Sequence, residues 1–229
     1  IEAEWIEFYR DLHRHPELSF RETRTAAKFA AALQAAGFEV TTKVGGLGVV
    51  GVVRNGEGKT LLLRCDMDAL PIGETTGLDY ASTIRVEDAQ GRVGGVMHAC
   101  GHDVHMTAVA ASAAWLCAHR DTWQGSLVVI GQPAEEVAGG AKAMLEDGLF
   151  SRFPRPDMAL ALHVTPELPT DTVGWRAGPA MANVESVDVV VRGRGGHGAA
   201  PHLTIDPVLI ASKLILDLQT IVSRELAPI

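Results

Sequence analysis

Three apolar runs that each lead into cation-binding residues constrain the fold of this chain most. Runs of this length and composition, rich in branched aliphatic side chains, are typical of strands buried on both faces of a sheet. Each run is followed within a few residues by carboxylates or an imidazole. The runs and the residues after them are 61–63 with Asp66 and Asp68, 126–130 with Glu135 and Glu136, and 158–162 with His163.

Segments with helical spacing alternate with these runs. They span residues 2–13, 19–36, 104–119 and 139–147. Helices that alternate with strands predict an α/β fold, a sandwich with a largely parallel sheet. Open sheets of this kind place their sites outside the carboxyl ends of the strands, so we expect the polar residues to meet at one edge.

A fourth group of donors lies in the loop at residues 98–105, which holds one thiol, three imidazoles and one carboxylate within eight positions. Gly101 allows the turn that points Cys100 and His102 at one centre. This mixture of ligand types indicates a metal site. The alternative, a helix N-terminus that carries histidines by chance, fits a lone His better than this loop.

Glu135 and Glu136 are adjacent, so their side chains point in different directions. One carboxylate can bind a metal while the other takes a proton from a water molecule at that metal. Taken alone, the pair is more typical of a solvated helix start, where acids are favoured, and the metal-type loop upstream is what favours the functional interpretation.

The remaining elements follow from shorter patterns. Ser19 to Glu22 reads as a capping box that opens the helix ending at Gly37. Further strands are expected over residues 38–42, 48–54, 59–64 and 185–192, with a turn at Asn55–Gly56, and a further helix over 207–223. Residues 193–198 match the G-x-G-x-x-G pattern of dinucleotide-binding turns, but the helix after them begins only near Asp206, too late to face a pyrophosphate.

The composition excludes two classes of partner. The chain has 229 residues, 47% of them hydrophobic, a net charge of −8 and no basic cluster, so nucleic-acid binding is not expected. No apolar run approaches the ~20 residues of a membrane span. The three cysteines argue against a disulfide framework and favour a cytoplasmic location, although a removed signal peptide is left open because residue 1 is not Met.

The chain resembles the zinc-dependent aminoacylase and carboxypeptidase-type metallopeptidases. Within them it is most similar to the amidohydrolase branch, which contains hippurate hydrolases, N-acyl-L-amino-acid amidohydrolases and auxin-conjugate hydrolases. The motifs that carry the resemblance are residues 12–19, 66–71 and 98–105, the Glu135–Glu136 pair, His163, and residues 193–202. The Cys100 loop is the most specific, because other branches carry Asp at that position.

The resemblance implies a zinc-exopeptidase-like α/β/α catalytic domain over residues 1–177. Residues 178–229 would begin an inserted α+β lid or dimerisation domain. The remainder of the lid and a C-terminal catalytic segment would lie outside this chain.

The resemblance also implies two divalent metal ions, zinc first, with manganese, cobalt and nickel left open. Cys100 would bridge them, Glu135 would act as general base, and Asp68 would orient a ligand imidazole. His197 would stabilise the oxyanion in a partner subunit's site, and His105 would bind substrate carboxylate. His13 and His15 are expected to pack beneath the site. The further ligands would be His102, Glu136 and His163.

The expected activity is hydrolysis of small-molecule N-acyl-L-amino acids, such as hippurate-like or N-acetyl substrates, to a carboxylic acid and an amino acid. A homodimer or higher homo-oligomer would form through the lid. Two alternatives are an aminopeptidase or carboxypeptidase acting on small peptides and a non-catalytic metal-binding homologue. The intact Glu135 argues against the second alternative, because a scaffold needs no base.

Overall fold

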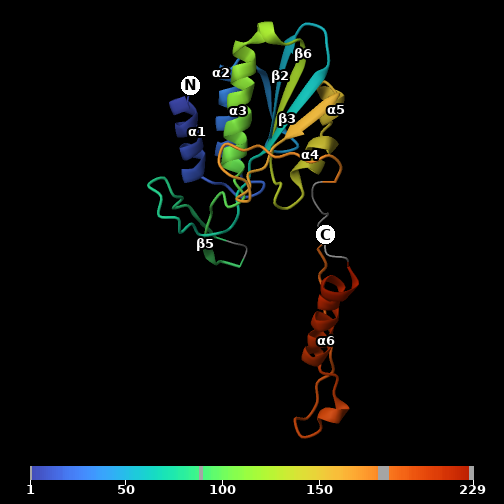
Figure 1. Cartoon of the computed structure of the whole chain (residues 1–229). Helices are drawn as coiled ribbons and strands as arrows, with labels where there is room; N and C mark the ends of the chain where they lie inside the picture. Colours follow the sequence, from blue (N-terminus) through green and yellow to red (C-terminus); the bar gives the residue numbers. More distant parts are fainter. Residues whose placement is uncertain (1, 88–89, 180–185, 227–229) are drawn as a thin grey trace. The chain divides into compact units, whose positions relative to one another are not determined.

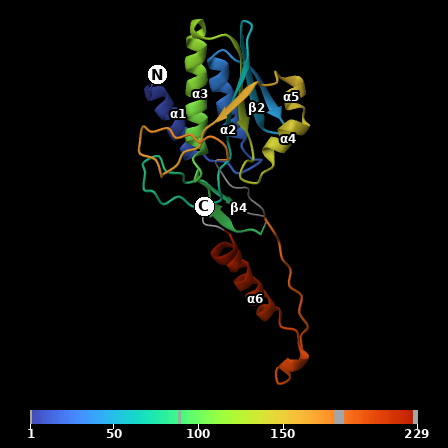
Figure 2. The ribbon, with the colours of Figure 1, turned by 45° about the vertical axis from the view of Figure 1, so that its right-hand side comes forward.

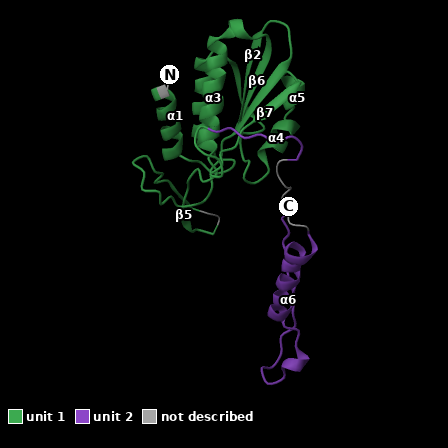
Figure 3. Ribbon diagram, viewed as in Figure 1, with its two compact units in different colours: residues 1–171 green, residues 172–229 purple. Residues whose placement is uncertain are grey.

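The computed structural model describes residues 2–87, 90–179 and 186–226. The chain divides into two compact units, Ile1–Asp171 and Thr172–Ile229 (Figure 3). The division falls a few residues before the boundary at residue 177 expected from the sequence. The first unit holds the sheet and all the donor residues named above except His197.

A five-stranded sheet with the order β1-β2-β6-β3-β7 forms the centre of the first unit (Figure 1). Strands β3, β6 and β7 run parallel, whereas β2 is antiparallel to both β1 and β6. The expectation of a largely parallel sheet is therefore wrong for the β1–β2 side. The strands are β1 (Glu39–Val44), β2 (Gly48–Asn55), β3 (Thr60–Asp66), β6 (Gly125–Gln132) and β7 (Met158–Ala161).

The turn at Asn55–Gly56 does not join paired strands. Strands β2 and β3 follow one another in the chain, but β6 lies between them and pairs with both. The apolar side chains of β6 are buried on both faces, which favours a central place in the sheet. Burial of β6 thus outweighs the local preference of an Asn-Gly turn for a hairpin.

Helices cover both faces of the sheet, which gives the α/β/α layers implied by the resemblance (Figures 1 and 2). The helices α1 (Glu2–Arg14), α2 (Thr23–Ala35) and α3 (His102–Ala118) bury Leu12, Phe29 and Met106 against one face. The short helices α4 (Gly140–Glu146) and α5 (Leu149–Arg152) bury Met144 and Leu149 against the other. These two cores fix the strand ends that carry the polar residues.

The predicted capping box is wrong. Helix α2 begins at Thr23, and its N-cap residue is Glu22 rather than Ser19. The Ser19 hydroxyl donates to Asp68, and the buried Glu22 carboxylate accepts hydrogen bonds from the backbone N–H groups of Phe20 and Ala134. The Ser19 side chain is therefore engaged by a distant segment of the chain, and the Glu22 carboxylate joins the nearby Phe20 to the distant Ala134, so the two residues do not form the predicted box.

The segment that joins β3 to α3 along the chain forms a second, two-stranded sheet. It consists of β4 (Arg85–Glu87) and β5 (Val93–Gly95), paired antiparallel. A bridge between Leu70 and Met97 closes the segment at its base. The whole segment leads directly into the Cys100 loop.

In the second unit, the helix expected after residue 206 is present. Helix α6 (Pro207–Thr220) begins at Asp206, whose carboxylate caps the N–H groups of Val208 and Leu209, and it continues into a π-helical turn, η3 (Ile221–Glu225). A short 3₁₀ turn, η2, spans Pro201–Leu203.

The strand expected over residues 185–192 is wrong for its described part, because residues 186–192 pair with no other described segment. Residue 185 lies outside the described residues. An extended segment becomes a strand only where a neighbour accepts its backbone hydrogen bonds. Within the parts of the chain that the structure describes, no helix has both the length and the apolar character needed to cross a bilayer.

Candidate metal centre

The candidate site lies where the parallel strands β3, β6 and β7 end and helix α3 begins. Asp66 ends β3, the Glu135–Glu136 pair follows β6, and His163 follows β7. The parallel direction of these strands brings their carboxyl ends to one edge, as the sequence predicted. His102 enters this edge as the first residue of α3.

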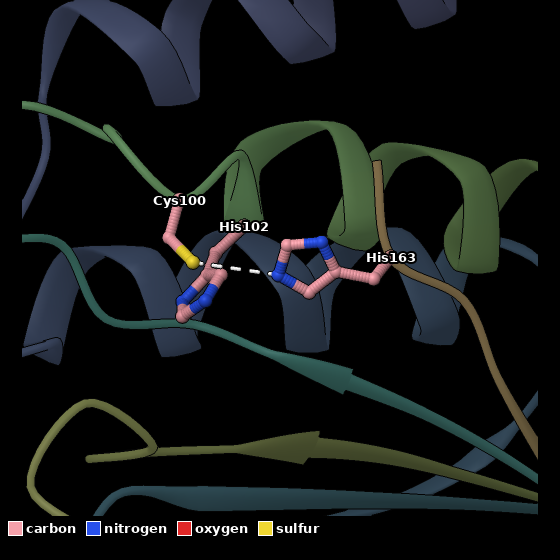
Figure 4. A group of neighbouring side chains, drawn as sticks. All are labelled: Cys100, His102 and His163. Carbon is pink, nitrogen blue, oxygen red and sulfur yellow. Dashed lines mark hydrogen bonds between the residues drawn. The ribbon is translucent and has the colours of Figure 1, made fainter. Parts of the chain in front are cut away.

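Cys100, His102 and His163 form one group whose ligand atoms all lie within 4.8 Å of one another (Figure 4). The sulfur of Cys100 is 3.4 Å from Nε2 of His163. The other ring nitrogen of His163, Nδ1, donates to the carbonyl oxygen of Val164 at 2.6 Å. That bond fixes the tautomer in which the Nε2 lone pair is available to a cation.

Gly101 makes this group possible. Its backbone is left-handed, with φ of 78°, and it caps helix α3. A Cβ atom at this position would lie 2.4 Å from Cγ2 of Val164, the residue after His163. Only glycine therefore lets the Cys100 loop and the His163 segment approach closely.

His102, Glu135 and Glu136 form a second group with ligand atoms within the same distance. Nε2 of His102 is 3.8 Å from Glu135 and 3.7 Å from Glu136. The two carboxylates differ in exposure, since the Glu135 side chain is 40% exposed and that of Glu136 is 17% exposed. The inner carboxylate suits a ligand, and the outer one can reach water and substrate.

Asp68 contacts members of both groups and fixes their positions relative to one another. Its carboxylate accepts hydrogen bonds from the backbone N–H groups of Glu135 and Glu136, both at 3.0 Å, and from the Ser19 hydroxyl at 2.7 Å. It also lies 3.4 Å from Nδ1 of His102. Burial alone would raise the pKa of Asp68, but these hydrogen bonds outweigh burial and lower it. Asp68 is therefore an ionised anchor for the carboxylate pair and for His102.

Asp66 and His105 form a buried pair beside the centre. Nδ1 of His105 donates to Asp66 at 2.7 Å, and Nε2 of His105 accepts from the backbone N–H of Val164 at 3.0 Å. Burial would raise the pKa of Asp66, but the hydrogen bond from His105 and the charges of His102 and Arg64 lower it to about 2. Asp66, His102 and His105 also form a third group with ligand atoms in metal-binding proximity.

His105 does not fit its predicted role in binding substrate carboxylate. Its side chain is fully buried, and both ring nitrogens are engaged by Asp66 and Val164. His105 instead links β3 to the segment after β7, and its ring packs edge-on against His163 with centroids 4.5 Å apart. Its contacts position Asp66 and His163.

Several buried polar atoms of the centre have no hydrogen-bond partner within the described ranges. They are both ring nitrogens of His102 and Oε1 of Glu136. Buried polar atoms are rarely left unpaired, so such a cluster in native structure needs an explanation. A divalent cation supplies it, because imidazole nitrogen, thiolate and carboxylate oxygen are the ligand types that zinc binds.

Without a cation, the thiol of Cys100 and the carboxyl of Glu136 hold their protons more tightly than usual. Burial and the carboxylates of Glu136 and Glu135 raise the pKa of the Cys100 thiol to about 11. Burial also raises the pKa of Glu136. A bound divalent cation would favour the thiolate form of Cys100, because metal binding displaces the thiol proton.

A network that the sequence did not predict lies beneath the centre. His13 of α1 is within 2.6 Å of Asp103 in the first turn of α3 and within 3.0 Å of Glu74. Hydrogen bonding to Asp103 raises the pKa of His13 to about 9, and Glu74 adds to this against the opposing effect of burial. His13 packs under the site as expected, whereas the roles of Glu74 and Ser19 depend on contacts that no local motif indicates.

His15 is not part of this network. It is partly exposed and hydrogen-bonds to the backbone carbonyl of Asp11 in the preceding helix α1. His197 belongs to the second unit, where its exposed ring accepts from the N–H of Ala199. Its predicted role at the oxyanion remains a prediction.

The fold and the donor set define an α/β/α protein with a cluster of residues that could hold a metal ion at the carboxyl edge of its sheet. Residues 62–224 match the model of peptidase family M20/M25/M40, and the chain belongs to this family. The resemblance stated from the sequence motifs is therefore confirmed.

Curated relatives place the chain beside amidohydrolases. It is 42% identical to hippurate hydrolase of Campylobacter jejuni over 229 residues, which cover 100% of this chain and 57% of that protein. It is 39% identical to N-acetyl-L-cysteine deacetylase of Bacillus subtilis over 230 residues, which cover 100% of this chain and 52% of that protein. The chain thus spans about half the length of these relatives.

A solved structure supports the fold. A dinuclear metal-binding peptidase of the M20 family from Bacillus subtilis superposes with a TM-score of 0.69 and is 36% identical. The match covers 77% of this chain and 47% of that one. The chain that carries these candidate ligands therefore shares its fold with a protein whose name states that it binds two metal ions.

Proposed function

We propose that the protein is a metal-dependent amidohydrolase that cleaves N-acyl-L-amino acids to a carboxylic acid and an amino acid. The observation that carries this proposal is the division of the Glu135–Glu136 pair, with both backbone amides held by Asp68 and one carboxylate more exposed than the other. A site that only stores a metal has no use for an accessible second carboxylate. The two relatives named for hydrolysing N-acyl amino acids support the substrate class.

The proposed metal content is two divalent ions, with zinc the first candidate. Cys100 would bridge them, and His102, Glu136 and His163 would be further ligands. When bound, such ions polarise the substrate carbonyl and lower the pKa of a water molecule toward ~7. The thiolate and imidazole ligands favour zinc over magnesium or calcium, while manganese, cobalt and nickel are tested beside it.

Glu135 would move the proton. Its carboxylate accepts the proton of the attacking water as the oxygen–carbon bond forms, and it delivers that proton to the amide nitrogen as the carbon–nitrogen bond breaks. The products are one carboxylic acid and one free amino acid. Asp68 would keep His102 and the Glu135 backbone in place through this cycle, because its carboxylate accepts from the backbone N–H of Glu135 and lies 3.4 Å from Nδ1 of His102.

His197 would act at the oxyanion of a second subunit, with the protein a homodimer or higher oligomer. Its position in an exposed, glycine-rich loop supports this part of the proposal. A mixture of His197→Ala protein and Glu135→Gln protein tests it, since subunits that share a site should recover activity when mixed.

All three cysteines are free thiols, which supports a reducing, cytoplasmic location.

A panel assay tests the activity itself. We expect N-benzoyl- and N-acetyl-amino acids to be hydrolysed, the activity to vanish with a chelator, and the activity to return with zinc, manganese, cobalt or nickel. Free dipeptides should be poorer substrates. Preferential cleavage of peptides would favour a peptidase, and metal binding without any turnover would favour a non-catalytic homologue.

A further inference from the structure

An open pocket of about 860 Å³ adjoins the candidate metal centre within the first unit. Glu136, the proposed inner ligand, forms part of its wall. The hairpin β4–β5 forms another part, and the loops before α2, after β3 and after β6 complete it. The volume lies in the range of sites that hold small molecules.

The wall of this pocket is largely apolar. Leu18, Leu70 and Val137 come from the loops, and Val86 and Val93 come from the hairpin. Val93 and Val137 are more than half exposed, at 55% and 59%, so their apolar surface faces the open space. Exposed apolar side chains grouped around a hollow typically mark a binding site.

The charges around the pocket do not favour an anion. Two carboxylates, of Glu87 and Glu136, are balanced by two guanidinium groups, of Arg21 and Arg92. A substrate α-carboxylate would meet no net positive charge and would lie beside the Glu136 carboxylate. An uncharged, apolar group fits this lining better.

We propose that this pocket binds the acyl group of the substrate and that the β4–β5 hairpin sets the size of acyl group accepted. The inference rests on the proposed amidohydrolase function. The scissile carbonyl must lie at the metal centre, and Glu136 belongs to both the centre and the pocket. The group attached to that carbonyl carbon can then enter the pocket while the amino-acid half extends away from it.

Gly94 of the hairpin allows a direct test of this proposal. It lines the pocket, and a Cβ atom at this position would meet no heavy atom within 4 Å. Gly73, in the loop after β3, has equally open space but does not line the pocket. Gly94→Leu should therefore reduce the pocket, and Gly73→Leu is the matched control.

The experiment measures kcat/KM of the metal-loaded enzyme with N-acetyl, N-hexanoyl and N-benzoyl derivatives of a single amino acid. Gly94→Leu should lower the ratio of benzoyl to acetyl turnover by about tenfold or more, which is the usual effect of one or two misfitting methylenes. Gly73→Leu should leave the ratio as in the parent. Val86 pairs with Gly94 across the hairpin, so the two positions share one face. Val86→Thr, which replaces a methyl group on that face with a hydroxyl, should lower the hexanoyl and benzoyl rates in the same direction.

Four outcomes would overturn the inference. An unchanged acyl ratio in both Gly94→Leu and Val86→Thr would show that acyl groups lie elsewhere. Selectivity that shifts with the amino acid instead of the acyl group, or an Arg21→Gln variant that loses affinity for every substrate, would place the amino-acid half in the pocket. A parent enzyme that hydrolyses no N-acyl amino acid would refute the proposed function and this inference with it, whereas an active parent with unchanged ratios refutes the inference alone.

Discussion

Glu135 and Glu136 are adjacent in the chain, but their surroundings favour different roles: general base for Glu135 and metal ligand for Glu136. Glu135→Gln should retain metal and lose about 10²–10⁴-fold in kcat, because an amide cannot take the proton of water. Glu136→Gln should lower metal content first. Metal analysis beside steady-state kinetics separates the two.

Glu146→Gln on α4 is the matched control for this pair, because its side chain is 68% exposed and forms an ion pair with Lys142 in the preceding helical turn. It should change neither property. Loss of metal in Glu135→Gln together with mere slowing in Glu136→Gln would reverse the proposed roles.

Cys100 is the residue whose chemistry depends most on the cation. Burial and two neighbouring carboxylates raise its pKa to about 11, so the thiol is protonated at neutral pH unless a metal displaces the proton. Cys100→Ser should bind at least one ion far more weakly, because a serine hydroxyl does not ionise there. Titration of chelator-treated protein with zinc measures the loss.

Cys117→Ser, at the far end of α3, is the control for that experiment and should titrate like the parent. Full recovery of Cys100→Ser at the parent's zinc concentration would remove the bridging role.

The elements of the fold were predictable where local pattern and burial agree. Strands 126–130 and 59–64 are present because their apolar side chains pack in the two cores on either face of the sheet, and helix 104–119 is present because its apolar side chains pack in one of them. The direction of β2 was not predictable, because nothing in residues 48–54 indicates that β6 inserts between β2 and β3.

The candidate site shows the same limit. The metal donors were predictable because their chemistry is concentrated in short motifs. The supports of the site were not, since His13 lies 61 residues from Glu74 and 90 from Asp103.

The His13 network joins three elements, and its contribution should depend on pH. The pKa of His13 is raised from 6.5 to about 9, so its stabilising effect is complete below pH 6.5 and is lost as pH rises through about 9. His13→Ala should cost about 3–5 kcal/mol at pH 7, because it leaves Asp103 and Glu74 without their cationic partner. Denaturant unfolding from pH 6 to pH 10 measures both effects.

The parent should lose stability between pH 7 and pH 10, and His13→Ala should lack that loss. His15→Ala, two residues away and partly exposed, should stay within about 0.5 kcal/mol of the parent. Equal pH slopes in the parent and His13→Ala would contradict the ion-pair assignment.

The molecule as a whole gathers four carboxylates at one sheet edge within a chain of net charge −8. Asp66, Asp68, Glu135 and Glu136 all lie close to His102. A cation bound only by the folded state stabilises it by about 2.7 kcal/mol at a hundredfold excess over Kd. Removal of metal should therefore lower the melting temperature by roughly 5–10 °C for a chain of this size.

A thermal scan with chelator, and then with zinc restored, measures this change. Magnesium at the same concentration is the control and should restore little, because thiolate and imidazole are poor ligands for it. A melting temperature indifferent to chelator would show that the carboxylate cluster is stable without a cation.

The close approach at Gly101 has a consequence for inheritance. Any side chain there would strike Val164 and separate the thiol of Cys100 from the imidazole of His163, and the left-handed backbone adds a further cost. Every change in the first two bases of a glycine codon introduces a side chain or, in one case, a stop codon, while every change in the third base is silent. A library scored by growth on an N-acyl amino acid should therefore tolerate only third-base variation at codon 101, although this residue offers no side chain to metal or substrate.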